Sequence, residues 1–220
     1  MRIGIMGGSF NPVHRGHLHA ARFCAQKLVL EEVWFIPAYV PPHKPESLFI
    51  SSYHRYAMIE LAIQKNFAYK ALPIEVETTH VCFTIDTIKN IIAPENKQAD
   101  KTSLNSSNQF FFIMGSDTLL EFQTWKNYNE LLDIIYFAVL ERKNNDFSMF
   151  ADLPACITSR FTALLNPSFC SAKNIILLPG KMLPVSSSRI RELISEGKNF
   201  ERLVPSSVAN YIKKYKLYKT

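Results

Sequence analysis

Apolar runs and helical spacings alternate from the first residues of the chain. Residues 2–6 form a short apolar run that stops at Gly7 and Gly8, and residues 16–30 then place apolar side chains at helical spacing. A second apolar run at 32–37 ends before the proline-rich residues 41–45, which can continue neither a strand nor a helix. The pattern therefore predicts a strand, a helix and a second strand, followed by a stiff loop.

The same alternation continues through the rest of the chain. The pattern predicts strands at 69–77, 110–114, 136–140 and 174–178, and helices at 52–64, 84–93, 188–196 and 205–215, with part of a further helix at 129–132. Residues 95–109 are polar and lack periodicity, which is typical of a mobile surface insertion without chemistry, and residues 144–173 predict no clear element. There is no internal repeat.

Strands that alternate with helices indicate an α/β fold. We expect a doubly wound parallel sheet in a single domain spanning residues 1–220, with a small helical C-terminal part at about 186–220. In such sheets ligands bind beyond the carboxyl ends of the strands. Because Gly7-Gly8, residues 37–44 and Gly115-Ser116-Asp117 all follow predicted strands, these segments should meet at one edge.

The segment after the first strand, GGSFNPVHRGH at residues 7–17, carries the clearest chemistry, and we call it the histidine turn. Its two glycines allow a ligand to approach the backbone closely, and the N–H groups at the start of the next helix favour phosphate. His14 and His17, three residues apart, can aim imidazole N–H groups at the same anion. The histidine turn is therefore predicted to handle phosphate.

Other interpretations of the histidines are weaker. A zinc site made of His14, His17 and His19 would have no cysteine or carboxylate beside it, and purely structural histidines would not explain their position around a glycine at a strand-to-helix turn. The chain also lacks a G-x-G-x-x-G fingerprint, and Gly180-Lys181 lacks the remainder of a P-loop.

Composition narrows the class of protein. The 220 residues are 47% hydrophobic and 20% charged, which is ordinary for a folded globular protein. No segment has the length and apolarity of a signal peptide or a membrane span, so a cytoplasmic protein is expected. The four scattered cysteines form no C-x-x-C pair, which argues against a zinc knuckle or a redox dithiol. The net charge of +6 suits an anionic substrate and would also suit nucleic acid.

The histidine turn resembles the signature of the nucleotidyltransferase superfamily, H/T-x-G-H, and several further motifs resemble the bacterial nicotinate-nucleotide adenylyltransferases. These motifs span nearly the whole chain in family order: PPHK at 41–44, FTIDT at 83–87, GSD at 115–117 with Trp125 eight residues on, and VSSSRIR at 185–191. Val185 and Ser188 stand where I-S-S-T is common in the family, and Phe83 replaces the more usual tyrosine. The first departure is chemically mild, and the second removes a side-chain hydrogen bond.

The resemblance implies a Rossmann-like nucleotidyltransferase fold and transfer of AMP from ATP to nicotinate mononucleotide, giving nicotinate adenine dinucleotide and pyrophosphate. Attack would be direct and in line, without a covalent enzyme intermediate, and positioning and electrostatics would supply catalysis. Mg²⁺ would be the cofactor, held mainly by the phosphates and not by a metal site of the protein. The partners would be the two small-molecule substrates, with neither nucleic acid nor membrane, while the oligomeric state stays open.

The resemblance also assigns roles to individual residues. The expected catalytic residues are His14, His17, Lys44 and Arg191. The expected ATP- and phosphate-binding residues are Gly7, Gly8, Ser9, Phe10, Gly16, Gly115, Asp117, Ser186, Ser187 and Ser188. The expected residues for nicotinate mononucleotide are Asn11, Phe83, Thr84 and Trp125.

Several of these residues also have ordinary structural interpretations. Ser186 to Ser188 precede a predicted helix and would equally serve as a serine N-cap, and Asp117 could anchor a ribose or a metal-bound water or simply cap a helix. Lys44 could be a solvated lysine, and Trp125 and Phe83 could stack on a flat ring or pack in the core.

Three other functions fit the sequence to different degrees. Transfer to another acceptor such as phosphopantetheine cannot be excluded by the histidine turn, although the PPHK and GSD motifs favour the pyridine nucleotide. A nucleic-acid-binding protein would leave the histidine turn unexplained, and no RNA-binding signature is present. An aminoacyl-activating domain could use the same H-x-G-H motif, but 220 residues would leave it little room for tRNA recognition.

Overall fold

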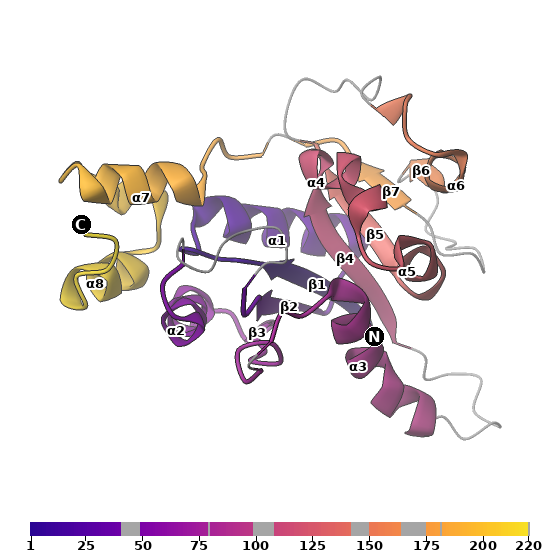
Figure 1. The fold of residues 1–220 in the computed structure, drawn as a ribbon, viewed down its shortest axis with the longest axis horizontal. Coiled ribbons are helices and arrows are strands. Elements are labelled where there is room, and N and C mark those ends of the chain that lie inside the picture. Colours follow the sequence, from indigo (N-terminus) through magenta and orange to yellow (C-terminus); the bar gives the residue numbers. More distant parts are fainter. Residues whose placement is uncertain are drawn as a thin grey trace.

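The computed structural model describes residues 1–40, 49–78, 80–98, 108–141, 150–163, 175–180 and 182–219. Strands and helices alternate along these ranges (Figure 1). The strands are β1 (Arg2–Gly8), β2 (Glu32–Pro37), β3 (Tyr69–Ala71), β4 (Gln109–Gly115), β5 (Tyr136–Leu140), β6 (Phe161–Ala163) and β7 (Ile175–Leu178). The α-helices are α1 (Arg15–Leu28), α2 (Ser52–Ile63), α3 (Thr84–Gln98), α4 (Ser116–Leu120), α5 (Tyr128–Ile134), α6 (Ala155–Thr158), α7 (Ser187–Ser195) and α8 (Ser206–Lys214). Two short 3₁₀ helices lie at Phe122–Thr124 and Glu201–Leu203.

The described strands form one parallel sheet in the order β3-β2-β1-β4-β5-β7-β6. The chain first builds outward from β1 through β2 to β3, and then returns to the other side of β1 with β4. The order therefore reverses between β1 and β4, and the predicted doubly wound parallel sheet is confirmed. Such a reversal opens a crevice beyond the carboxyl ends of the two central strands.

Side chains alternate between the two faces of the sheet and build one core on each. In β4, Phe111 and Ile113 enter the cluster shared with α1, α2, α7 and α8, whereas Phe110, Phe112 and Met114 enter the cluster shared with α3, α4, α5 and α6. Both faces of the strand are thus buried, which explains its continuous apolar sequence.

The C-terminal helices share the core of the first face. Ile190 of α7 and Val208 of α8 belong to the same cluster as Met6 of β1, and the Ser207 hydroxyl donates to the Leu61 carbonyl of α2 at 2.8 Å. Figure 1 shows α7 and α8 together beside α2. The C-terminal helical part therefore shares the core of this face and packs against α2.

Strand β3 is shorter than the pattern predicts. Only Tyr69–Ala71 pairs with β2, and the residues after it form a turn in which Glu77 N–H donates to the Pro73 carbonyl at 3.1 Å. Proline has no N–H to donate to a ladder, so pairing stops before it. The predicted strand over 69–77 was wrong in its second half.

Helix α3 is longer than the pattern predicts. It continues through position 94 to Gln98, so residues 95–98 of the predicted insertion are helical, and Gln109 already belongs to β4. Residues 99–107 lie outside the described residues. The apolar periodicity on which the prediction rested ends at Ala93, while the helix itself does not.

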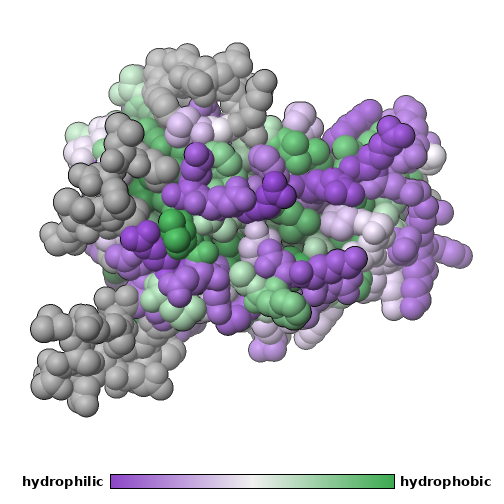
Figure 2. All heavy atoms as spheres, turned by 180° about the vertical axis from the view of Figure 1, so that it is seen from behind, coloured by the Kyte–Doolittle hydropathy of each residue, from purple (hydrophilic) through white to green (hydrophobic). Residues whose placement is uncertain are grey.

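The pattern of apolar residues did not predict several short elements. Helices α4 and α6 have five and four residues, and β6 has three, which is too short for a periodicity to show. In the described part of the chain no helix is long and apolar enough to cross a membrane. Figure 2 shows hydrophilic and hydrophobic residues interspersed over the face seen from behind.

Candidate active site

A cavity of about 520 Å³ lies at the carboxyl ends of β1 and β4, where the strand order reverses. Gly7 and Gly8 of β1 line it on one side, and Gly115 at the end of β4 lines it on the other. Ser9 of the histidine turn and Asp117 in the first turn of α4 also line it. The predicted meeting at one sheet edge is therefore observed for the segments after β1 and β4, and Ala38 after β2 also lines the cavity, whereas residues 41–44 lie outside the described residues.

His14 and His17 both line this cavity, and their rings are stacked with centroids 3.7 Å apart. His14 is the N-cap of α1, and its backbone N–H donates to Nδ1 of His17 at 3.2 Å. Because Nδ1 of His17 accepts a hydrogen bond, the proton of the neutral ring is assigned to Nε2. The N-cap contact thus fixes both the orientation and the tautomer of His17.

Gly16 leaves space for the His14 ring. A Cβ atom at this position would lie 2.9 Å from His14 Nδ1 and 3.0 Å from its Cε1, closer than side-chain atoms pack. Gly16 also lines the cavity. A residue with a Cβ atom at position 16 would therefore collide with the His14 ring, which explains the glycine of the H-x-G-H motif.

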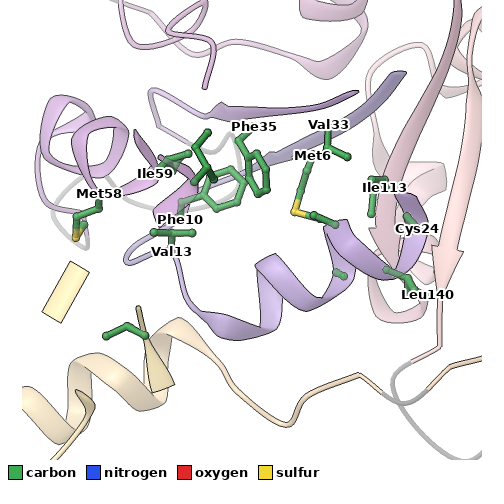
Figure 3. Packing of buried hydrophobic residues seen from close by; sticks show 14 of the residues in the cluster. Met6, Phe10, Val13, Cys24, Val33, Phe35, Met58, Ile59, Ile113 and Leu140 are labelled. Carbon is green, nitrogen blue, oxygen red and sulfur yellow. The ribbon is translucent and has the colours of Figure 1, made fainter. Parts of the chain in front are cut away.

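Phe10 and Asn11 lie behind the cavity wall, outside its lining. The Phe10 ring is 1% exposed and packs against the His17 ring, with centroids 4.9 Å apart. It also packs against the Phe35 ring, with centroids 5.9 Å apart (Figure 3). Phe10 has a φ of 43°, in the left-handed region that non-glycine residues rarely adopt, and burial of its ring stabilises this turn. Asn11 is completely buried. These two side chains shape the histidine turn from behind.

The N-terminus of α7 is fastened to the histidine turn. The Ser187 hydroxyl donates to the Pro12 carbonyl at 2.8 Å, and the Arg191 guanidinium donates to the Asn11 carbonyl at 2.8 Å and to Ser188 Oγ at 3.3 Å. Ser186 is the N-cap of α7, where its Oγ accepts from the backbone N–H of Arg189 at 3.2 Å. The three serines and Arg191 therefore border the turn, whereas Val185 before them reaches the cavity lining.

Phe83, Thr84 and Trp125 also line the cavity. Phe83 and Trp125 pack against the core cluster on one face of the sheet, whereas Phe10 and Val13 of the histidine turn belong to the cluster on the other face, so we call this part the aromatic end. Thr84 begins α3, and Trp125 follows the 3₁₀ helix Phe122–Thr124. The Trp125 ring meets the Phe112 ring edge to face, with centroids 5.7 Å apart and an interplanar angle of 86°. The aromatic residues thus form a flat-sided end of the cavity next to the N-terminus of a 15-residue helix. Lys44 lies outside the described residues.

Arg55 of α2 was not found from the sequence, although it binds both loops beside the cavity. Its guanidinium is 1% exposed and donates to the carbonyls of Ser9 at 2.8 Å, Ala38 at 2.6 Å and Tyr39 at 2.5 Å, while its Nε donates to Ile50 at 3.2 Å. One buried cation therefore joins the loop after β1 to the loop after β2. Its spacing in α2 gives no signal of this, because its partners are distant in sequence.

Glu75 extends this network to α3, and sequence analysis missed it too. It lines the cavity, accepts from the Thr87 hydroxyl at 2.7 Å and from the backbone of Tyr39, and experiences the charge of Arg55. Burial raises the pKa of the Glu75 carboxyl above its ordinary value, although these donors and Arg55 act in the opposite direction. Thr87 of the FTIDT segment is thus connected to the loop after β2.

Among the described residues, no group of three or more His, Cys, Asp and Glu side chains is arranged to hold a metal ion. Three carboxylates nevertheless line the cavity, those of Glu75, Asp117 and Glu121. Oxygen donors of this kind suit Mg²⁺, which protein sites commonly hold through one or two carboxylates, waters and substrate phosphates.

Residues 5–193 match the model of the cytidylyltransferase-like family. The chain therefore belongs to the cytidylyltransferase-like family.

Curated relatives specify the group within this family. A protein of Geotalea uraniireducens (strain Rf4) is 35% identical over 222 residues, covering 99% of this chain and 98% of the relative. A protein of Thermoanaerobacter sp. (strain X514) is 35% identical over 220 residues, covering 100% and 95% of the two chains. Both carry the name "Probable nicotinate-nucleotide adenylyltransferase". The resemblance to the bacterial nicotinate-nucleotide adenylyltransferases is confirmed over the full chain.

A solved structure has the same fold. It is the Plasmodium falciparum nicotinic acid mononucleotide adenylyltransferase complexed with NaAD. The alignment covers 99% of this chain and 97% of the solved chain, with a TM-score of 0.72 and 19% sequence identity. The Rossmann-like nucleotidyltransferase fold predicted from the sequence is therefore confirmed.

Proposed function

We propose that the protein transfers the AMP part of ATP to nicotinate mononucleotide, releasing pyrophosphate and forming nicotinate adenine dinucleotide. The observation that carries this proposal is one cavity that joins the histidine turn to an aromatic end formed with Phe83 and Trp125. Relatives named for the same reaction align over 98% and 95% of their lengths. The reaction belongs to the biosynthesis of NAD.

The chemical step is an in-line displacement at phosphorus. An oxygen of the mononucleotide phosphate attacks the α-phosphorus of ATP, the bond to the β-phosphate oxygen breaks, and pyrophosphate leaves with that electron pair. His17, with its proton on Nε2, donates to an α-phosphate oxygen as charge builds up there, and His14 stacks on it and faces the same cavity. Gly7, Gly8, Ser9 and Gly16 let the triphosphate approach the backbone of the histidine turn.

The N-terminus of α7 receives the departing pyrophosphate. The backbone N–H groups of Ser186, Ser187 and Ser188 and the hydroxyls of Ser186 and Ser188 are donors for its β- and γ-phosphates, while the Ser187 hydroxyl donates to the Pro12 carbonyl. Arg191 holds its guanidinium beside the histidine turn through the Asn11 carbonyl, so its planar fork is fixed before substrate arrives. Lys44, which follows β2 in the sequence, is proposed to add a point charge.

The donor set of the cavity fits a hydrated Mg²⁺ carried by the triphosphate. Asp117, at the start of α4 and next to Gly115, would accept from the waters of this ion or from a ribose hydroxyl. The ion supplies neutralisation of the triphosphate charge when bound.

The aromatic end holds the pyridine ring of the acceptor. Trp125 and Phe83 offer ring surfaces for stacking, and the N–H groups at the start of α3, beginning with Thr84, face a carboxylate better than an amide. An amide would direct its NH₂ group at another donor and leave one of them unpaired. Nicotinate mononucleotide is therefore preferred over its nicotinamide counterpart.

A coupled assay of pyrophosphate release tests the function. ATP is offered with nicotinate mononucleotide, nicotinamide mononucleotide or phosphopantetheine, and mass spectrometry identifies the product. The proposal expects nicotinate adenine dinucleotide as the main product, with a loss of signal when the acceptor is omitted. Faster turnover of phosphopantetheine, or release without an acceptor, would refute it.

A further inference from the structure

The charges on the cavity lining are unequal. Three carboxylates line the cavity, yet Lys126 is the one lysine or arginine that the described residues contribute to this lining. An excess of carboxylates disfavours anionic ligands by like-charge repulsion. Lys126 is therefore the one fixed side-chain cation in the described part of this lining that can attract a negatively charged substituent.

Lys126 lies at the aromatic end, and two contacts fix its ammonium group there. Nζ is 4.6 Å from the centroid of the Phe83 ring and 3.0 Å from Oδ2 of Asp86 in the first turn of α3. Lys126 also directly follows Trp125. Its charge is therefore held beside the rings between which the acceptor's pyridine is placed.

We propose that Lys126 is a specificity-determining residue, whose ammonium favours an aromatic mononucleotide carrying an anionic ring substituent over one carrying a neutral substituent. This inference rests on the proposed function, because it assumes that the acceptor ring occupies the Phe83 and Trp125 end. In this proposal the Lys126 ammonium acts on the ring substituent together with the backbone N–H groups at the start of α3.

The charge acts differently on the two parts of the acceptor. Both pyridine mononucleotides carry the same phosphate, so the attraction of Lys126 for this phosphate is common to them and cancels in a ratio. The carboxylate of one ring and the amide of the other differ by a full charge at the end where Lys126 lies. The ratio of kcat/KM values for the two acceptors therefore isolates the proposed role from general electrostatic attraction.

The expected effect is moderate. Side-chain exposures of 45% for Lys126 and 52% for Asp86 mean that solvent screens both charges, and Asp86 offsets part of the field. A screened unit charge a few ångström from a carboxylate corresponds to a change of about three- to tenfold in the ratio.

The test compares Lys126→Gln with Lys89→Gln. Lys89 is a matched control, because it is 48% exposed, pairs with Glu130 at 2.7 Å, and lies on α3 without lining the cavity. The kcat/KM ratio of nicotinate to nicotinamide mononucleotide should fall about three- to tenfold in Lys126→Gln and stay unchanged in Lys89→Gln. Lys126→Arg, which keeps the charge, should retain the wild-type ratio. Calorimetric binding of each mononucleotide gives a second readout that does not depend on turnover.

The outcomes separate this inference from the function itself. If wild type makes nicotinate adenine dinucleotide but Lys126→Gln lowers kcat/KM equally for both acceptors, or Lys89→Gln lowers the ratio as much, the role of Lys126 is refuted alone. If wild type forms no dinucleotide from either mononucleotide, both the function and the role of Lys126 are refuted. A selective loss with the nicotinate acceptor supports both.

Discussion

The hydroxyl of Tyr218 donates a hydrogen bond to Oδ1 of Asn11 across 2.9 Å. Burial raises the pKa of Tyr218, so the hydroxyl keeps its proton and remains a donor at neutral pH. Because Arg191 donates to the carbonyl of the same asparagine, the histidine turn is held from outside by two side chains of the C-terminal helical part.

Tyr218→Phe removes this donor while keeping the ring. We expect the free energy of unfolding to fall by about 1–2 kcal/mol, since a buried acceptor loses its hydrogen bond. Urea unfolding measures this change, and Tyr215→Phe serves as control because Tyr215 is 47% exposed. Equal stability of Tyr218→Phe and wild type would contradict a structural role for the contact.

His17→Ala removes the donor assigned to the α-phosphate. Loss of one such transition-state donor costs about 10²–10³ in kcat, while the fold should persist because the ring is only half-buried. Steady-state kinetics and circular dichroism measure the two effects. His19→Ala should retain activity, since His19 contacts the Phe23 ring on α1 and does not line the cavity.

Gly16→Ala should damage activity far more than stability. The added Cβ would meet the His14 ring at 2.9 Å, whereas alanine near the start of α1 suits a helix. We expect a loss of about tenfold or more in kcat/KM, as for other small displacements of catalytic groups. A double-mutant cycle tests the route: in a His14→Ala background, Gly16→Ala should cost little more. Additive losses would show that Gly16 acts independently of His14.

Arg55→Lys keeps the positive charge but removes the planar guanidinium that donates several hydrogen bonds at once. A single ammonium cannot reach the carbonyls of Ser9, Ala38 and Tyr39 and the Ile50 carbonyl with the same geometry, so we expect a loss of about 2–4 kcal/mol in the free energy of unfolding. Chemical denaturation provides the measurement. Arg189→Lys is the matched control, because Arg189 is exposed and pairs only across one helical turn with Glu192. A comparable loss in both variants would argue against a special role for Arg55.

Alkaline pH should destabilise the protein through Cys24. Burial raises the pKa of this thiol from 9.0 to about 12, so the unfolded chain releases the thiol proton at lower pH than the folded one. The stabilisation is fully present below pH 9.0 and is lost as pH rises towards about 12, by at most about 1.4 kcal/mol per pH unit. Tyr69 and Tyr218, whose pKa values burial also raises from 10.0, add to the loss above that pH. Denaturation of Cys24→Ala across this range should show a shallower slope; an unchanged slope below pH 10.0 would contradict the assignment.

The parts of the fold that depend on local pattern could be predicted from the sequence. The runs at 32–37 and 136–140 coincide with β2 and β5, because strands buried on both faces are continuously apolar. The shortened β3 and the lengthened α3 could not be predicted, since Pro73 interrupts pairing without interrupting the apolar run, and residues 95–98 are polar yet helical.

The same distinction holds for the site. The histidine turn is contiguous, so the relation of His14, Gly16 and His17 can be inferred from spacing alone. Arg55, Lys126 and Tyr218 gave no signal, because their partners lie 46, 40 and 207 residues away and only the folded chain brings them together. Phe10 and Asn11 carry the family motif, yet their side chains face the core, a direction that a one-dimensional pattern does not encode.

The contact between Asn11 and Tyr218 also orders events during synthesis. The histidine turn leaves the ribosome before α8 and Tyr218, which emerge about two hundred residues later, since the contact spans 207 positions. A nascent chain that stops before α8 therefore carries the catalytic motif, Ser187 and Arg191, but lacks Tyr218, which also fastens the motif, and lacks Val208 and Ile212 of the shared core. Such a chain exposes the motif but does not present a finished site.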